Sequence, residues 1–172
     1  MKRLIGKIFR KIKAWEEKDR LSQLRRTYLI PDSFRFNGND ILIYGKGSLE
    51  IGENSYIGSL STIQLQEGNK VKIGDGCSIS HNVRIYTSSK DPNFDFKYKD
   101  SATMKCGDVI IENYAWIGAN VFINPGITIG ENSVIGANSV VTKNIEPNSI
   151  NGGVPAKIIK MKTFNNEQLW NG

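Results

Sequence analysis

From residue 49 onward, aliphatic residues recur at every sixth position of the chain. The longest such series consists of Ile111, Ile117, Ile123, Ile129, Ile135 and Val141. Shorter series contain Ile51, Ile57 and Ile63, and Ile73, Ile79 and Ile85. Glycine or asparagine often stands between these positions, where a turning backbone needs unusual angles. A period of six predicts a parallel β-helix with three sides of six residues per coil and aliphatic side chains pointing inward.

The start of a coil can be located by a four-residue pattern: an aliphatic residue, any residue, isoleucine, and then glycine or glutamate. Four starts fit this pattern: Leu49, Val71, Val109 and Ile127. Their spacings of 22, 38 and 18 residues exceed a coil of 18 by 4, 20 and 0. The large excess predicts a loop over residues 88–107 that leaves the second coil. Long loops on rigid scaffolds often carry function, so this loop is a candidate part of a site.

The N-terminal segment follows a helical period, and its apolar residues are Met1, Leu4, Ile5, Ile8, Phe9, Ile12 and Trp15. The helix is expected to end before Pro31. The segment has neither the uninterrupted apolar stretch of a membrane span nor the cleavage site of a secretory signal. Two interpretations of residues 1–15 stay open. The apolar stripe lies in an anionic membrane surface, or it packs on the rest of the protein or on a partner subunit.

Composition and charge narrow the classes of protein. The chain has 172 residues, enough for one ordinary domain, with 23 Lys and Arg against 17 Asp and Glu. Residues 1–13 hold six of the cations and no acid, so the rest is neutral by count, which argues against nucleic acid as a partner. Two cysteines are too few for a disulfide scaffold. The single histidine, His81, excludes zinc sites built from several histidines, and no metal is expected.

An ordered set of motifs fills residues 109–160: AWIGANV at 115–121, NPGITIG at 124–130, VIGANSVVTK at 134–143 and GVPAK at 153–157. This sequence resembles the hexapeptide-repeat acyltransferases, especially the sugar and xenobiotic O-acetyltransferases. The resemblance implies a left-handed β-helix, a homotrimer, and acyl-CoA bound in the groove between neighbouring subunits.

We therefore expect an all-β fold, a left-handed parallel β-helix of hexapeptide repeats. Residues 1–40 would form a basic amphipathic helix and the segment that leads into the solenoid. Residues 41–160 would form the acyltransferase β-helix, with the loop at 88–107. Residues 161–172 would form a short helical tail that starts near Thr163.

In the resembling sugar O-acetyltransferases, the extended loop carries the catalytic histidine. The matching stretch here, residues 86–92, reads Tyr-Thr-Ser-Ser-Lys-Asp-Pro. It places Lys90 at that position, or Asp91 after a shift of one residue. A protonated lysine is a poor general base, so this departure shifts attention to another residue.

The position of His81 within its coil makes it the candidate for a general base. His81 lies eight residues after Ile73, and the same offset in the other coils gives Ser59, Ala119 and Ala137. These four residues are predicted to form one column, with neighbours about 4.8 Å apart. In the resembling family, the two alanine positions line the thioester and pantetheine groove, and the amide matching Ala119 faces the acyl carbonyl.

A second resemblance also concerns His81. Residues 79–83, Ile-Ser-His-Asn-Val, are similar to the text that bears the base in lipid A acyltransferases and bacterial sugar N-acetyltransferases. A neutral imidazole can accept a hydroxyl or amine proton at neutral pH. His81 is therefore the candidate general base, and an ordinary hydrogen-bonded or solvated corner residue is the alternative. The loop acids Asp91, Asp95 and Asp100 are candidates to orient its ring.

The resemblance implies roles for further residues. Trp116 would wall the acyl site, with plain corner packing as the alternative. The CoA-binding set would comprise Ala119, Ala137, Thr142, Lys143, Lys157 and Lys160. For the lysines, the alternative is an ordinary solvated surface. Cys77 occupies a small inward position and is interpreted as a core residue rather than a nucleophile.

These features predict an acetyl-CoA-dependent O-acetyltransferase that modifies a saccharide hydroxyl in surface polysaccharide or lipopolysaccharide synthesis. One alternative is an N-acetyltransferase of an amino sugar nucleotide. An alternative of another class is a non-catalytic β-helix scaffold or CoA binder. The expected location is the cytoplasm, at the inner face of the cell membrane if the basic helix binds lipid.

Overall fold

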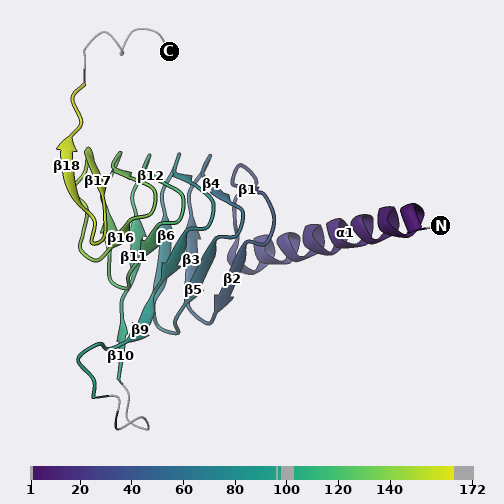
Figure 1. The fold of residues 1–172 in the computed structure, drawn as a ribbon, viewed down its shortest axis with the longest axis horizontal. Helices are drawn as coiled ribbons and strands as arrows, with labels where there is room; N and C mark the ends of the chain where they lie inside the picture. The colour runs from purple at the N-terminus through teal and green to yellow at the C-terminus, as the bar shows by residue number, and fades with distance from the viewer. Residues whose placement is uncertain (1, 96, 98–102, 165–172) are drawn as a thin grey trace.

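The computed structural model describes residues 2–95, 97 and 103–164 (Figure 1). Three sheets, parallel except for the last strand of the first, form the sides of a solenoid, and α1 (Lys2–Tyr28) precedes them. The first sheet contains, in spatial order, β1 (Arg35–Asn37), β4 (Tyr56–Gly58), β7 (Ser78–Ile79), β12 (Trp116–Ile117), β15 (Val134–Ile135), β17 (Ser149–Gly152) and β18 (Lys157–Met161). The second contains β2 (Leu42–Gly45), β5 (Thr62–Leu65), β8 (Arg84–Tyr86), β13 (Phe122–Ile123) and β16 (Val140–Val141). The third contains β3 (Ser48–Ile51), β6 (Lys70–Ile73), β11 (Val109–Ile111) and β14 (Thr128–Ile129).

The six-residue period defines the core of this solenoid. In the first sheet, Ile79 is in register with Ile57 on one side and Ile117 on the other, and none of the three is exposed. The predicted coil starts are confirmed, because Val71 pairs with both Leu49 and Val109 in the third sheet. Each coil therefore buries its aliphatic residues against those of the coils above and below.

Asparagines form a ladder at one corner. Asn82, Asn120 and Asn138 have φ angles of 55°, 59° and 60°, a region that asparagine tolerates better than most residues. The Asn82 side chain donates a hydrogen bond to Asn120 Oδ1 over 2.7 Å, and Asn120 donates to Asn138 Oδ1 over 2.9 Å. The ladder ties three successive coils together next to the His81 column.

The solenoid begins earlier than residue 49. β1 pairs with β4 and β2 pairs with β5, while Phe34 and Ile41 are fully buried. The first strand of the parallel sheet thus lies within the segment 1–40. This coil starts on aromatic residues, and Arg35 pairs with Tyr56 at a spacing outside the regular period, so the sixfold pattern does not reveal it.

The predicted loop begins and ends as an antiparallel hairpin of β9 (Ser88–Lys90) and β10 (Met104–Cys106), which projects from the solenoid (Figure 1). At the other end of the molecule, β18 pairs antiparallel with β17, an element that the sequence pattern did not predict. Thr163 follows β18 without helical structure, and most of the predicted tail helix, residues 165–172, lies outside the described residues.

The helix α1 extends from the N-terminal end of the solenoid (Figure 1). Leu24 and Tyr28, near its C-terminal end, pack against the core. The Arg25 guanidinium donates hydrogen bonds to the carbonyl oxygens of Pro31 and Phe34, both over 2.6 Å. No described helix combines the length and apolarity needed to cross a bilayer.

Candidate functional site

The register of the first sheet places Ser59, His81, Ala119 and Ala137 in one column, as the spacing predicts. Backbone hydrogen bonds connect the coils at this corner. The Asn120 amide donates to His81 O over 3.1 Å, and the Asn138 amide donates to Ala119 O over 2.8 Å. His81 therefore lies one coil away from Ala119.

The backbone of His81 is closely packed, whereas its side chain is exposed. A Cβ atom on Gly58, in the preceding coil, would lie 2.6 Å from His81 N, so only glycine allows the two coils to approach this closely. Within the described part of the chain, the imidazole has no hydrogen-bond partner. The ring is thus carried on a fixed backbone and is open to an incoming molecule.

The amide of Ala119 differs from the amides of the residues before and after it in the chain. The Gly118 amide donates to Ile135 O over 2.8 Å and the Asn120 amide donates to His81 O, both as coil-to-coil bonds. The Ala119 N–H has no backbone acceptor among the described residues. A backbone N–H without an acceptor can bind an oxygen atom that gains negative charge, as an oxyanion hole requires.

Trp116 lies on the outer face of β12, three residues before Ala119. It is in register with Ser78 and Val134, and it is 54% exposed. Packing within the corner therefore does not account for this large aromatic side chain. An exposed indole beside the column is available to contact a bound group.

Four residues of the predicted CoA-binding set, Thr142, Lys143, Lys157 and Lys160, lie at two different places. Lys157, on the outermost strand, is paired with Gly152. The next residue, Gly153, continues the column, because it lies two positions after Asn151, the partner of Ile135. Lys160, on the same strand, is paired with Ile150. Thr142 and Lys143 follow β16, at the end of a strand in the second sheet. All four are exposed, and the structure brings Lys157 to the end of the column.

The loop acids bind their own loop. Asp91 Oδ1 accepts a hydrogen bond from the Asn93 amide over 2.9 Å, and Asp95 Oδ1 accepts one from the Lys97 amide over 3.0 Å. Asp100 lies outside the described residues. Lys90 is exposed on the hairpin opposite Met104. In the described part of the loop, neither carboxylate contacts His81.

Cys77 is fully buried, and its thiol donates a hydrogen bond to Glu112 O over 3.1 Å. Burial raises the pKa of the Cys77 thiol, which keeps it protonated and unreactive at neutral pH. The core interpretation of Cys77 is confirmed. No group of three or more His, Cys, Asp or Glu side chains that could hold a metal ion occurs among the residues placed by the structure.

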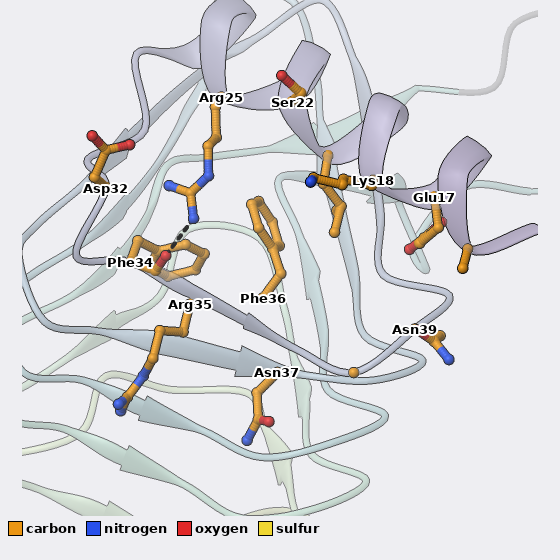
Figure 2. A pocket seen from close by; sticks show the side chains of 13 residues that line it. Glu17, Lys18, Ser22, Arg25, Asp32, Phe34, Arg35, Phe36, Asn37 and Asn39 are labelled. Atoms are coloured by element: carbon orange, nitrogen blue, oxygen red, sulfur yellow. Dashed lines mark hydrogen bonds between the residues drawn. The ribbon is translucent and has the colours of Figure 1, made fainter. Parts of the chain in front are cut away.

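A groove of about 1010 Å³ lies between α1 and the first coil, and sequence reasoning did not predict it. Figure 2 shows the Phe36 side chain directed toward the helix, whereas Arg35 and Asn37 point away from it. The rings of Phe34 and Phe36 meet edge to face at 5.2 Å, with the Arg25 guanidinium 5.3 Å from the Phe36 ring centre. Gly38 also lines the groove.

The groove adjoins the His81 column. Gly38 occupies the position next to Ser59, because a Cβ atom on Gly38 would lie 2.7 Å from Ser59 Cβ. Along one corner, the order is therefore Gly38, Ser59, His81, Ala119, Ala137 and Gly153. The signal that could have located the groove is Phe34-Arg35-Phe36, whose alternation is typical of a strand with one buried face.

Comparisons with known proteins agree with this geometry. Residues 108–143 match a family model described as bacterial transferase hexapeptide (six repeats), and residues 49–87 match one described as hexapeptide repeat of succinyl-transferase. The galactoside O-acetyltransferase of Escherichia coli K12 is 36% identical over 143 residues, which cover 79% of this chain and 68% of that protein. The chain therefore belongs to the hexapeptide-repeat acetyltransferases.

Two solved structures resemble the fold. A galactoside acetyltransferase in complex with coenzyme A is 30% identical, with a TM-score of 0.70 over 87% of this chain and 76% of that one. A hexapeptide-repeat acetyltransferase from Vibrio cholerae, in complex with acetyl coenzyme A, is 27% identical, with a TM-score of 0.74 over 86% of this chain and 79% of that one.

Proposed function

We propose that the protein transfers an acetyl group from acetyl-CoA to a saccharide hydroxyl, with His81 as the general base. The observation that carries the proposal is the placement of an exposed imidazole one coil from the unbonded Ala119 amide. The relatives support the donor and the acceptor class, because one binds acetyl-CoA and another is a galactoside O-acetyltransferase. The proposed setting is the synthesis of surface polysaccharide or lipopolysaccharide in the cytoplasm.

The reaction needs one proton acceptor and one oxyanion donor. A ring nitrogen of His81 takes the proton of the acceptor hydroxyl while its oxygen attacks the thioester carbonyl carbon. The carbonyl oxygen gains negative charge and receives the hydrogen bond of the Ala119 N–H. When the carbon–sulfur bond breaks, the CoA thiolate takes the proton back from the imidazolium. The products are an acetyl ester and CoA, and no covalent enzyme intermediate forms.

The order of residues along the corner suggests where each substrate lies. Acetyl-CoA would extend from Ala119 past Ala137 toward Lys157, with Trp116 beside the acyl group. The acceptor would approach His81 from the side of Ser59 and Gly38, where small residues leave room. The proposal includes a homotrimer in which a neighbouring subunit forms the other wall of this groove.

Replacing Lys157 with alanine is expected to raise the KM for acetyl-CoA about tenfold and to leave kcat little changed, because a charged contact to a phosphate would be lost. Steady-state kinetics with varied acetyl-CoA measure this. Lys72→Ala removes an exposed lysine from β6, in the third sheet, and should change neither constant. If Lys143→Ala raises KM while Lys157→Ala does not, the phosphates bind near the end of β16 instead.

The proposed function is tested by following CoA release with a thiol reagent, using the full chain, acetyl-CoA and pooled saccharides. Acceptor-dependent release with neutral sugars supports O-acetylation. Release only with amino sugar nucleotides would replace the proposal with N-acetylation. Acetyl-CoA binding by calorimetry without release from any acceptor would favour a non-catalytic CoA binder.

A further inference from the structure

We propose that the N-terminal half of α1 docks this protein on an anionic lipid bilayer. The docking face is the apolar stripe, defined as Leu4, Ile5, Ile8, Phe9, Ile12 and Trp15. Each of these residues is between 48% and 70% exposed. The structure therefore does not show the stripe packed on the rest of the same chain, which is one part of the second interpretation of the sequence.

The helix has two apolar faces that point in opposite directions. Successive residues of an α-helix are rotated by about 100°, which places the whole stripe within an arc of roughly 140°. By the same arithmetic, the centre of the face formed by Leu21, Leu24 and Tyr28 is rotated by roughly 170° from the centre of the stripe. One rigid helix cannot bury both faces against the same solenoid.

The second face is the one that the solenoid covers. Leu24 and Tyr28 pack against the core, and Arg25 bonds to two backbone carbonyl groups of the first coil. On the same side, the Glu17 carboxylate accepts hydrogen bonds from the Arg20 guanidinium. The hydrogen bond from Arg20, together with one from the Asp40 backbone, lowers the pKa of Glu17. The packing of Leu24 and Tyr28 and the hydrogen bonds of Arg25 orient α1 so that the stripe faces away from the body.

The charges around the stripe identify its occupant. The segment before Glu16 contains no acid, and its exposed cations are Arg3, Lys7, Arg10, Lys11 and Lys13. The rotation of about 100° per residue places Lys11 beside Leu4 and Lys13 near Phe9, at opposite borders of the stripe. Long cationic side chains at such borders can extend to lipid phosphates while the apolar residues enter the acyl region.

The length and composition of the stripe also fit a surface position. Residues 4–15 cover about 18 Å at 1.5 Å per residue, too short to cross a bilayer but suited to a helix that lies in its interface. Trp15 closes the stripe with a side chain typical of that interface. A second copy of the same segment would bring cations against cations, so charge favours an anionic lipid surface over self-association.

The test is co-sedimentation of the full chain with vesicles of phosphatidylcholine alone or with 30% phosphatidylglycerol. The wild type is expected to sediment with the anionic vesicles only, and less so as salt is raised. Phe9→Glu should lower the bound fraction about tenfold or more, because an aromatic side chain is lost from the apolar phase. Leu29→Glu, which replaces an apolar residue that is 88% exposed outside the stripe, should bind as the wild type does.

Three results would overturn the proposal: no binding to either vesicle, equal binding to both, or unchanged binding of Phe9→Glu. Sedimentation velocity of the wild type and Phe9→Glu tests the alternative that a second copy of the chain covers the stripe. If the wild type ignores vesicles and Phe9→Glu dissociates its oligomer, a second copy covers the stripe. CoA release with a soluble acceptor should be equal in wild type and Phe9→Glu, which keeps this test independent of the proposed reaction.

Discussion

Replacing His81 with alanine is expected to lower kcat for acetyl transfer by about 10²–10⁴-fold, the usual contribution of a general base. The exposed imidazole stands beside the Ala119 amide, and alanine cannot accept the proton of the acceptor hydroxyl. The KM for acetyl-CoA should change little, because the thioester and phosphate contacts would lie in later coils. Initial rates of CoA release with a saccharide acceptor measure the effect, and circular dichroism verifies that the variant is folded.

A second variant, Lys90→Ala, distinguishes His81 from the loop residue as the general base. The resemblance places Lys90, or Asp91 after a shift of one residue, at the position of the loop histidine, and Lys90 lies on the hairpin rather than in the column. If His81 is the base, Lys90→Ala should retain most of the wild-type kcat. A loss of activity in Lys90→Ala combined with wild-type kcat in His81→Ala would move the base to the loop.

The largest loss of stability is expected from shortening a central isoleucine. Ile79 is fully buried between Ile57 and Ile117, so Ile79→Ala should lower the free energy of unfolding by about 2–5 kcal/mol. Both the lost burial and the cavity left in the stack contribute. Ile79→Val is the matched control and should cost about 0.5–1.5 kcal/mol.

Equilibrium unfolding in urea, followed by circular dichroism, measures both losses. Each coil of a solenoid contacts only the coils next to it, so the cavity would weaken the junctions on either side of the coil that carries His81. An Ile79→Ala variant no less stable than Ile79→Val would show that the stack relaxes to fill the space.

The regular part of the fold could be predicted because the sixfold period and the burial have the same origin. An inward position such as Ile117 or Ile135 recurs once per side and is fully buried. The first coil escaped prediction because it replaces aliphatic residues with Phe34 and Phe36. The strand β18 escaped because its five residues are all exposed and its position depends on backbone pairing with β17.

Of the candidate site, the column could be predicted from the sequence, whereas the groove beside it could not. Counting from Ile73 placed His81 in line with Ala119, since every insertion leaves the column positions unchanged. The resemblance implied a role for the Ala119 amide, but the repeat pattern alone does not show which amides at this corner lack a coil-to-coil hydrogen bond. The groove above Gly38 depends on where α1 lies, and that in turn depends on contacts of Arg25 with backbone carbonyl groups.

The position of His81 in the order of coils fixes a length. Neighbouring members of the column are about 4.8 Å apart, so Gly38 and the groove beneath α1 lie roughly 10 Å from the histidine. The column thus sets the distance between the groove, which Phe34 and Phe36 line, and the proposed general base His81. An acceptor bound in that groove would reach His81 only if it extended across two coils. Adding or deleting one coil would therefore change the length of acceptor that fits.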